Sequence, residues 1–293
     1  MKRTVNISEL METSGVKFGT SGARGLVRCM TDRVCFAYTA AFLQFLRGAR
    51  RIEAGTDVAI AGDLRPSTER IMRAVLRAVI EAGYGPICCG RVPSPAVALL
   101  GLQRGIPAIM VTGSHIPDDR NGIKFNTPDG EILKNDEERI RACAVTIPDI
   151  FADNGMLRPE ERPAEQPVDE AAARNYVARW LAAFPPDALD GMRVGLYAHS
   201  AVGRDLLHQV LRGLGAHVTR LADSDRFIPV DTEAIRPEDV QAAARWAVEH
   251  GLDAIVSTDG DGDRPLVSDE HGRWLRGDVA GILCARYLGA DVV

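Results

Sequence analysis

The sequence predicts an α/β protein made of two tandem three-layer α/β/α domains with largely parallel mixed sheets. The first observation is an alternation of short apolar stretches, many ending in Gly, Ser, Thr or Asp, with longer stretches of helical spacing. The second is a polar, proline-rich stretch over 148–168 that interrupts this alternation near the middle of the chain. At 293 residues the chain is long enough for two domains, each with its own core.

In the first half, apolar periodicity predicts a helix that begins after Thr31 or Asp32 and a second that begins at Ser67 or Thr68. Asp63 and Arg65, which follow a short strand, are interpreted as mainly structural residues that hold a loop. The expected elements are helices over 32–50, 68–82, 94–103 and 135–146, and strands over 58–61, 86–89 and 106–111.

The second half repeats this order, so we expect a first domain over 1–150, a linker over 151–168 and a second domain over 169–276. Its expected elements are helices over 170–183, 203–214, 237–249 and 278–287, and strands over 193–197, 217–221 and 253–257.

Composition excludes several classes of protein. Hydrophobic residues make up 46% of the chain and charged residues 26%, which is a globular composition. The chain has 35 Lys and Arg against 40 Asp and Glu and contains no basic run, so no nucleic-acid surface is indicated. Six cysteines show no metal-site spacing, which favours reduced, mostly buried thiols. No apolar run reaches membrane-spanning length and no signal-peptide core follows the N-terminus, so a cytoplasmic protein without a membrane partner is expected.

A loop after the strand 106–111 is the main candidate site. Ser114 and His115 follow the strand at the edge where open α/β sheets bind ligands. Gly113 is expected to allow a close backbone approach, and Asn121-Gly122 to form a second tight turn that returns Lys124 toward the serine. A hydroxyl, an imidazole and an ammonium group suit carrying a phosphoryl group on Ser114.

Other interpretations of this loop are a plain turn or a hydrolase nucleophile. Many Ser-His pairs are turn residues without a catalytic role. A hydrolase elbow requires glycines two residues before and after the serine, where this chain has Thr112 and Ile116. The elbow is therefore excluded.

A glycine-rich segment over 17–25 is a second candidate. Thr20, Ser21 and Arg24 stand among three glycines, a composition that can offer backbone N–H groups and a fixed cation to a phosphate.

The stretch 258–265 is a candidate metal loop. Asp259, Asp261 and Asp263 alternate with glycines, so their carboxylates can meet one hard cation, magnesium or calcium rather than zinc. An EF-hand would place Gly where Arg264 stands and a helix before the loop, which argues against a calcium-binding structural protein. A solvated acidic turn is the other alternative, although three close carboxylates repel one another.

These motifs resemble those of the α-D-phosphohexomutases. Thr-Gly-Ser-His-Ile-Pro over 112–117 with Asn-Gly-Ile-Lys-Phe over 121–125 is similar to the family's phosphoserine loop, and Gly-Thr-Ser-Gly-Ala-Arg-Gly over 19–25 to its N-terminal segment. Asp-Gly-Asp-Gly-Asp-Arg over 259–264 matches its metal loop. The resemblance implies that Ser114 is phosphorylated in the resting enzyme and that Arg24 reaches this phosphate.

It further implies that Mg²⁺ is held by a phosphoserine oxygen and the three aspartates. Lys124 is then the candidate general acid/base, and His115 a candidate for proton handling or phosphoryl binding. Arg264 is expected to face the sugar or the phosphoryl group. In weaker roles, Lys124 would only screen charge and His115 would only orient the loop.

The implied activity is an isomerisation. Phospho-Ser114 donates to a hexose monophosphate, a hexose 1,6-bisphosphate turns over, and phosphate moves between carbons six and one. Val-Asp-Thr-Glu over 230–233 resembles a phosphomannomutase subgroup. Phosphoglucomutase and phosphoglucosamine mutase are alternatives, although Gly113 and Ile116 depart from the Ala-Ser-His-Asn-Pro usual in the latter. A non-catalytic metal- or phosphosugar-binding fragment is the alternative from another class.

The resemblance covers two of the family's four domains. The third-domain Gly-Glu-x-Ser-Gly-His sugar loop does not occur in the chain, and 277–293 reads as the start of that domain. We therefore expect a truncated chain with little mutase activity by itself. The preferred hexose and the oligomeric state are not determined by the sequence.

Overall fold

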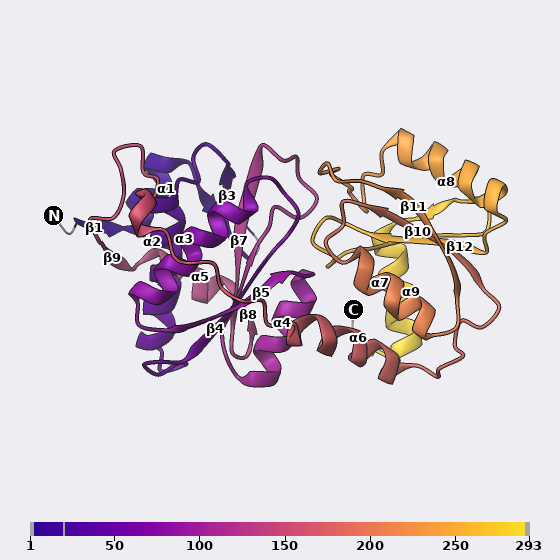
Figure 1. Ribbon diagram of the computed structural model, residues 1–293, viewed down its shortest axis with the longest axis horizontal. Coiled ribbons are helices and arrows are strands. Elements are labelled where there is room, and N and C mark those ends of the chain that lie inside the picture. The colour runs from indigo at the N-terminus through magenta and orange to yellow at the C-terminus, as the bar shows by residue number, and fades with distance from the viewer. Residues whose placement is uncertain (1–2, 20, 291–293) are drawn as a thin grey trace. The chain divides into compact units, whose positions relative to one another are not determined.

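The computed structural model describes residues 3–19 and 21–290 (Figure 1). Backbone contacts divide the chain into two units. The first runs to Gly113 and continues from Pro117 to Ala173, whereas the second contains Ser114–Ile116 and the chain from Arg174 onward. The three residues that include the candidate serine thus group with the second unit, although the strand before them belongs to the first.

The first unit contains a six-strand path of order β2-β3-β7-β6-β4-β5, with β8 paired to β7, and a separate pair β1-β9. Its elements are β1 (Arg3–Asn6), α1 (Ile7–Ser14), β2 (Lys17–Phe18), β3 (Gly22–Leu26), α2 (Asp32–Gly48), β4 (Asp57–Gly62), α3 (Thr68–Glu81), β5 (Gly85–Arg91), α4 (Ser94–Arg104), β6 (Ala108–Val111), β7 (Arg120–Thr127), β8 (Gly130–Glu131), α5 (Lys134–Arg141), β9 (Ala144–Ile147) and the 3₁₀ turn η1 (Pro159–Glu161).

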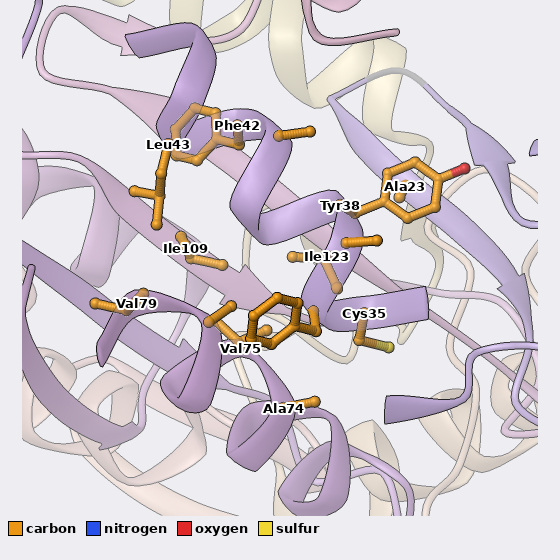
Figure 2. Packing of buried hydrophobic residues seen from close by; sticks show 14 of the residues in the cluster. Ala23, Cys35, Tyr38, Phe42, Leu43, Ala74, Val75, Val79, Ile109 and Ile123 are labelled. Atoms are coloured by element: carbon orange, nitrogen blue, oxygen red, sulfur yellow. The ribbon is translucent and has the colours of Figure 1, made fainter. Parts of the chain in front are cut away.

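The larger core of this unit lies between the sheet and the helices α2 and α3. Phe42 of α2 stacks on Phe125 of β7 with 4.6 Å between ring centroids. Figure 2 shows Val75 and Val79 of α3 beside Ile109 of β6, all within one buried cluster. The opposite face is covered by α4, where Gly101 allows contact with Ala108 because a Cβ there would lie 3.1 Å from the alanine Cβ. Both faces of the sheet are therefore buried, as the apolar strands predicted.

The second unit contains a five-stranded sheet of order β11-β10-β12-β13-β14. Its elements are α6 (Ala171–Ala183, which begins at the end of the first unit), β10 (Arg193–His199), α7 (Arg204–Gly213), β11 (His217–Asp223), α8 (Pro237–His250), β12 (Ala254–Thr258), β13 (Pro265–Ser268), β14 (Trp274–Leu275) and α9 (Gly277–Leu288).

Two separate clusters cover the two faces of this sheet. Tyr197 and Ile255 pack against Ala243 and Ala247 of α8 on one face. Val194 packs with residues of α7, including Leu211, on the other. Figure 1 shows α8 and α7 on opposite sides of the strands β10 and β12. The unit is a three-layer α/β/α arrangement.

The predicted fold class is confirmed: each unit is α/β with a mixed sheet. Parallel pairing is less extensive than expected, because it is confined to β4 with β5 and β6, and to β10 with β11 and β12. The antiparallel strands β3, β7 and β13 complete the sheets.

Two local predictions are wrong. The helix expected over 135–146 ends at Arg141, and Ala144–Ile147 instead forms β9, which pairs antiparallel with β1. Asn121-Gly122 lies within β7, not in a turn, and the chain reverses earlier, where the Arg120 N–H donates to the Pro117 carbonyl at 3.2 Å.

The structure also bears on two expectations from composition. Six cysteines are free thiols; Cys35 and Cys89 are buried, whereas Cys284 is exposed, so the thiols are less buried than expected. Among the described residues, none of the helices combines the length and apolar character that crossing a bilayer requires.

Candidate active site

The residues that flank the candidate serine are held by a buried ion pair in the first unit. Arg65 Nε lies 3.0 Å from Asp63 Oδ2, and both side chains are fully buried. Asp63 also accepts from the Thr112 hydroxyl at 2.8 Å, before the serine. Arg65 Nη1 donates to the carbonyl of Pro117 at 2.8 Å, after it. The structural role predicted for Asp63 and Arg65 is confirmed.

Gly113 lies against the buried side chain of Arg65. A Cβ at this position would lie 2.6 Å from the guanidinium carbon of Arg65. The glycine therefore leaves room for the buried arginine, which a larger residue would displace.

Ser114 has an unusual backbone conformation for a residue other than glycine. Its φ is 55°, in the left-handed region. Such strain costs about 1–2 kcal/mol and persists where surrounding contacts hold it. The side chain is 2% exposed, and its hydroxyl donates to Asp259 Oδ2 at 2.6 Å, across 145 positions of sequence.

Asp259 begins a tight loop between β12 and β13. Its Oδ1 accepts from the backbone N–H of Gly262 at 3.1 Å and of Arg264 at 3.3 Å, while its own N–H donates to the Arg264 carbonyl. Gly262 has φ 76°, which a glycine adopts at no steric cost. The alternating glycines thus fold the loop around the first aspartate.

Asp259, Asp261 and Asp263 each offer one carboxylate oxygen, and these oxygens lie within 4.8 Å of one another. Asp259 and Asp261 are fully buried and Asp263 is exposed. Burial, followed by the negative charges of Asp261 and Asp263, raises the pKa of Asp259 to about 8. A bound cation would relieve the repulsion between these carboxylates and let Asp259 ionise.

The donor set fits a hard divalent cation. Three carboxylate oxygens, with no nitrogen or sulfur, are ligands that magnesium and calcium prefer. Strands β12 and β13, not helices, flank the loop, so the EF-hand alternative is excluded. Burial of two of the three aspartates also argues against a solvated acidic turn.

His115 lies between an arginine and an aspartate. Arg264 Nη1 is 3.0 Å from His115 Nδ1, and since arginine only donates, this ring nitrogen accepts. The Ser114 hydroxyl is 3.3 Å from the same nitrogen. The Nε2 atom then carries the proton, and it points toward Asp231 Oδ2 at 3.8 Å.

Asp231 extends this chain of polar groups. Burial raises the pKa of Asp231, but the backbone N–H groups of Glu233 and Ala234, together with the charge of Arg264, outweigh burial, so this pKa lies below its ordinary value. Asp231 therefore stays ionised beside the imidazole at neutral pH.

Arg24 and Lys124 lie in the first unit, on the paired strands β3 and β7. Lys124 is opposite Gly22, two residues before Arg24, so both side chains are on the same face of the sheet. Arg24 lines a cavity of about 390 Å³ together with Lys17 and Arg120, and none of the described residues that line it carries a carboxylate. This cavity suits an anion.

Two residues of the glycine-rich segment complete the predicted set. Ser21 is buried, and its carbonyl accepts from the Phe125 N–H at 3.0 Å. Thr20 lies outside the described residues.

Two polar residues beside the site were not singled out by the sequence. Asp231 belongs to a loop noted for its composition alone, and His199 ends β10. His199 is the last residue of β10, and the carboxyl end of an apolar strand is the signal that identified Ser114. The strand expected over 193–197 stops two residues before His199.

Two family models match the chain in sequence. Residues 15–149 match the alpha/beta/alpha domain I of phosphoglucomutase/phosphomannomutase, and residues 173–272 match domain II.

Similar proteins carry related names. The chain is 45% identical over all of its 293 residues to a phosphomannomutase of Salmonella muenchen, and covers 58% of that protein. It is 44% identical to a phosphomannomutase of Sinorhizobium fredii, with 95% of the chain and 58% of that protein aligned. A phosphoglucosamine mutase of Dinoroseobacter shibae is 33% identical over 89% of the chain and 57% of its own length. The chain thus spans somewhat more than half of these relatives.

Solved structures share the fold. A phosphoglucomutase/phosphomannomutase family protein of Burkholderia thailandensis has a TM-score of 0.72 at 20% identity, with 97% of this chain and 59% of that chain covered. The phosphoglucomutase parafusin of Paramecium has a TM-score of 0.66 at 16% identity, with 92% and 55% covered. Since consecutive first and second domains are matched in order, the chain belongs to the phosphoglucomutase/phosphomannomutase family.

Proposed function

We propose that the chain belongs to an intramolecular phosphotransferase that interconverts hexose 6-phosphate and hexose 1-phosphate, and that this enzyme is a phosphomannomutase. The relatives at 44–45% identity are named phosphomannomutases, whereas the named phosphoglucosamine mutases are 27–33% identical. These names concern proteins of which the chain covers 58% or a similar share, so the activity is proposed for the whole protein.

One observation carries this proposal. The Ser114 hydroxyl oxygen lies 2.6 Å from a carboxylate of a three-aspartate cluster whose oxygens are within 4.8 Å of one another. A nucleophilic oxygen next to a hard-cation site is the arrangement that phosphoryl transfer needs, because its catalysis depends mainly on positioning and on neutralising charge.

The residues of the second unit then have the following proposed roles. Ser114 carries the phosphoryl group, and Asp259, Asp261 and Asp263 hold Mg²⁺ together with an oxygen of that group. When bound, the ion neutralises charge on the phosphoryl oxygens. His115 binds the transferring phosphoryl group or takes part in proton handling; because its Nδ1 accepts from Arg264, its Nε2–H is the donor.

The residues of the first unit supply cations. We assign Lys124 as the general acid/base for the sugar hydroxyl, since a flexible amine can give and take a proton. Arg24 binds the phosphoryl group of Ser114, and Arg264 of the second unit faces the sugar or the phosphoryl group. Thr20 and Ser21 contribute contacts to phosphate. Placement of Arg24 and Lys124 on one face of paired strands supports their acting together.

The reaction proceeds through a hexose 1,6-bisphosphate, which also serves as activator. The phosphoryl group leaves Ser114 for the free hydroxyl of the hexose monophosphate, and the other phosphate of the bisphosphate returns to Ser114. Each transfer breaks one P–O bond and forms another, so no water is consumed.

The domain boundaries remain proposals: a first domain over 1–150, a linker over 151–168, a second domain over 169–276, and 277–293 as the beginning of a third. The family matches over 15–149 and 173–272 support the first and the second domain. A cytoplasmic location is proposed as well, in keeping with the six free thiols.

Intact mass spectrometry of the 293-residue chain tests the function. After incubation with Mg²⁺ and mannose 1,6-bisphosphate, the wild-type chain is expected to gain one phosphoryl group, and Ser114→Ala none. Ser8→Ala is the matched control and should leave the gain unchanged, because this serine lies in α1, where its hydroxyl donates to the Arg141 carbonyl, and has no proposed role in the site. A gain that persists in Ser114→Ala would overturn the proposal.

A second candidate is a non-catalytic metal- and phosphosugar-binding module, because the three-aspartate cluster and the cavity beside Arg24 would also serve binding alone. It predicts that phospho-Ser114 forms but is not discharged by mannose 6-phosphate. Discharge on adding the monophosphate would favour the enzyme.

A further inference from the structure

His199 is a buried histidine at the end of β10 that contacts the loop carrying the aspartates. Its side chain is 0% exposed, and Nε2 lies 2.9 Å from the carbonyl oxygen of Thr258, the residue before Asp259. Because a carbonyl only accepts, Nε2 carries the proton and Nδ1 is the unprotonated nitrogen. In the described part of the chain, Nδ1 has no hydrogen-bond partner.

The imidazole is a fixed neutral donor. Burial lowers the pKa of His199 to about 4, and the hydrogen bond to Thr258 opposes this only in part. The ring therefore has no charge at neutral pH, and its contribution to the neighbouring loop is the single N–H···O bond.

The backbone of His199 is strained and held in place. Its φ is 29°, outside the regions that most residues other than glycine adopt. Its carbonyl accepts from Arg204 Nη1 at 2.5 Å and from the Ser224 N–H at 3.0 Å. Arg204 Nη1 also donates to the Ser224 carbonyl at 2.8 Å. Strain of this kind persists where contacts over-determine a position, and it is concentrated near functional sites.

The next residue contacts the other loop of the site. The Ser200 hydroxyl accepts from the Ile228 N–H at 2.7 Å. Ile228 is three residues before Asp231, whose carboxylate faces His115. Two consecutive residues, His199 and Ser200, thus contact both loops that carry polar groups of the site.

We propose that His199 is a positioning residue for the cation site: its Nε2–H fixes the Thr258 carbonyl and thereby the direction in which Asp259 enters the loop. This inference rests on the proposed metal site. The bond fixes a backbone group adjacent to a ligand, as outer partners of metal ligands do, and loss of such partners typically lowers metal affinity about 10- to 100-fold.

Substitution of His199 by glutamine or by asparagine distinguishes the roles of the two ring nitrogens. The amide nitrogen of Gln reaches the place of Nε2, so His199→Gln keeps the donor to Thr258. The amide nitrogen of Asn corresponds to Nδ1, so His199→Asn loses that donor, although asparagine tolerates positive φ better than most residues. Relief of backbone strain and loss of the donor therefore act in opposite directions in His199→Asn.

Mn²⁺ is the probe, titrated into each full 293-residue chain and followed by its EPR signal, with thermal unfolding of each variant recorded by circular dichroism. We expect His199→Asn to weaken Mn²⁺ binding at least about 10-fold, and His199→Gln to stay within about threefold of wild type. His217→Asn, at an exposed histidine that begins β11, should bind as wild type. If His199→Asn does not fold, His199→Met replaces it, since it fills space without a donor.

Wild-type affinity in a folded His199→Asn or His199→Met chain would overturn the inference. Equal weakening by Gln and Asn would also overturn it, because the ring would then act by packing and not as a donor. Failure of the wild-type chain to bind Mn²⁺ would instead overturn the metal site on which the inference rests.

Discussion

Two buried aspartates, one in each unit, occupy similar places in their folds but have opposite surroundings. Asp63 follows β4 and Asp259 follows β12, and both are 0% exposed. Asp63 contacts a guanidinium and donors: Arg65 at 3.0 Å, the Thr68 hydroxyl at 2.6 Å and the Thr112 hydroxyl at 2.8 Å.

Asp259 accepts from the Ser114 hydroxyl and faces two further carboxylates. Burial and the negative charges of Asp261 and Asp263 raise its pKa to about 8, and the bond from Ser114 opposes them only in part. A buried carboxylate with a cationic partner has its charge balanced within the chain, whereas one that faces like charges needs a cation from outside the chain. The partners of each aspartate, and not its place after a strand, therefore decide its role.

Asp63→Asn is expected to have the largest effect on stability. The change leaves the buried Arg65 without its carboxylate, and breaking a buried pair costs about 3–5 kcal/mol. Urea unfolding of the 293-residue chain, followed by circular dichroism, measures the loss in free energy of unfolding. Asp223→Asn, which breaks the exposed pair with Arg220, should cost at most about 1 kcal/mol. Equal losses in the two variants would contradict the buried-pair account.

Asp259→Asn should change stability in the opposite direction. A folded pKa of about 8 lies above the ordinary value, so the native state holds a proton that the unfolded chain releases. The free energy of unfolding of wild type thus falls as pH rises through this window and is lowest above pH 8. Asparagine has no such dependence, so at pH 7.5 without metal the variant should have a higher free energy of unfolding than wild type. A less stable variant would be inconsistent with the repulsion.

Magnesium should remove the same repulsion in the wild-type chain. At a concentration 100 times its dissociation constant, a ligand of the native state stabilises by about 2.7 kcal/mol. Thermal unfolding at pH 8 should therefore shift upward with MgCl₂ in wild type and not in Asp259→Asn or Asp261→Asn. The shift should shrink toward pH 6, because the protonated Asp259 must release its proton to bind the ion. A shift that persists in both variants would place the ion elsewhere.

The smallest effect concerns the backbone of Ser114. Because its φ is 55°, glycine at this position avoids a steric cost that alanine bears. Ser114→Gly should be more stable than Ser114→Ala by up to about 1 kcal/mol, measured by urea unfolding. Since both variants lose the hydrogen bond from the Ser114 hydroxyl to Asp259, the difference between their free energies of unfolding reports the backbone strain alone. No difference would indicate that the loop relaxes.

Local pattern in the sequence determined much of this fold. Amphipathic spacing predicted α2, α3 and α8, and apolar runs predicted β4, β6 and β10, because helix and strand periods depend on near neighbours. Contiguous motifs also identified Ser114 and the three aspartates as candidates.

Tertiary structure alone decided the rest. The strand β9 forms because Ala144–Ile147 pairs with β1, more than 130 positions away, and β7 forms because it inserts between β3 and β6 despite its Asn-Gly pair. The bond from Ser114 to Asp259, the proton location on His199 and the raised pKa of Asp259 likewise depend on distant partners and burial. Residue order specifies which groups are present, but charge, protonation and backbone strain are set by the neighbours that folding brings to each group.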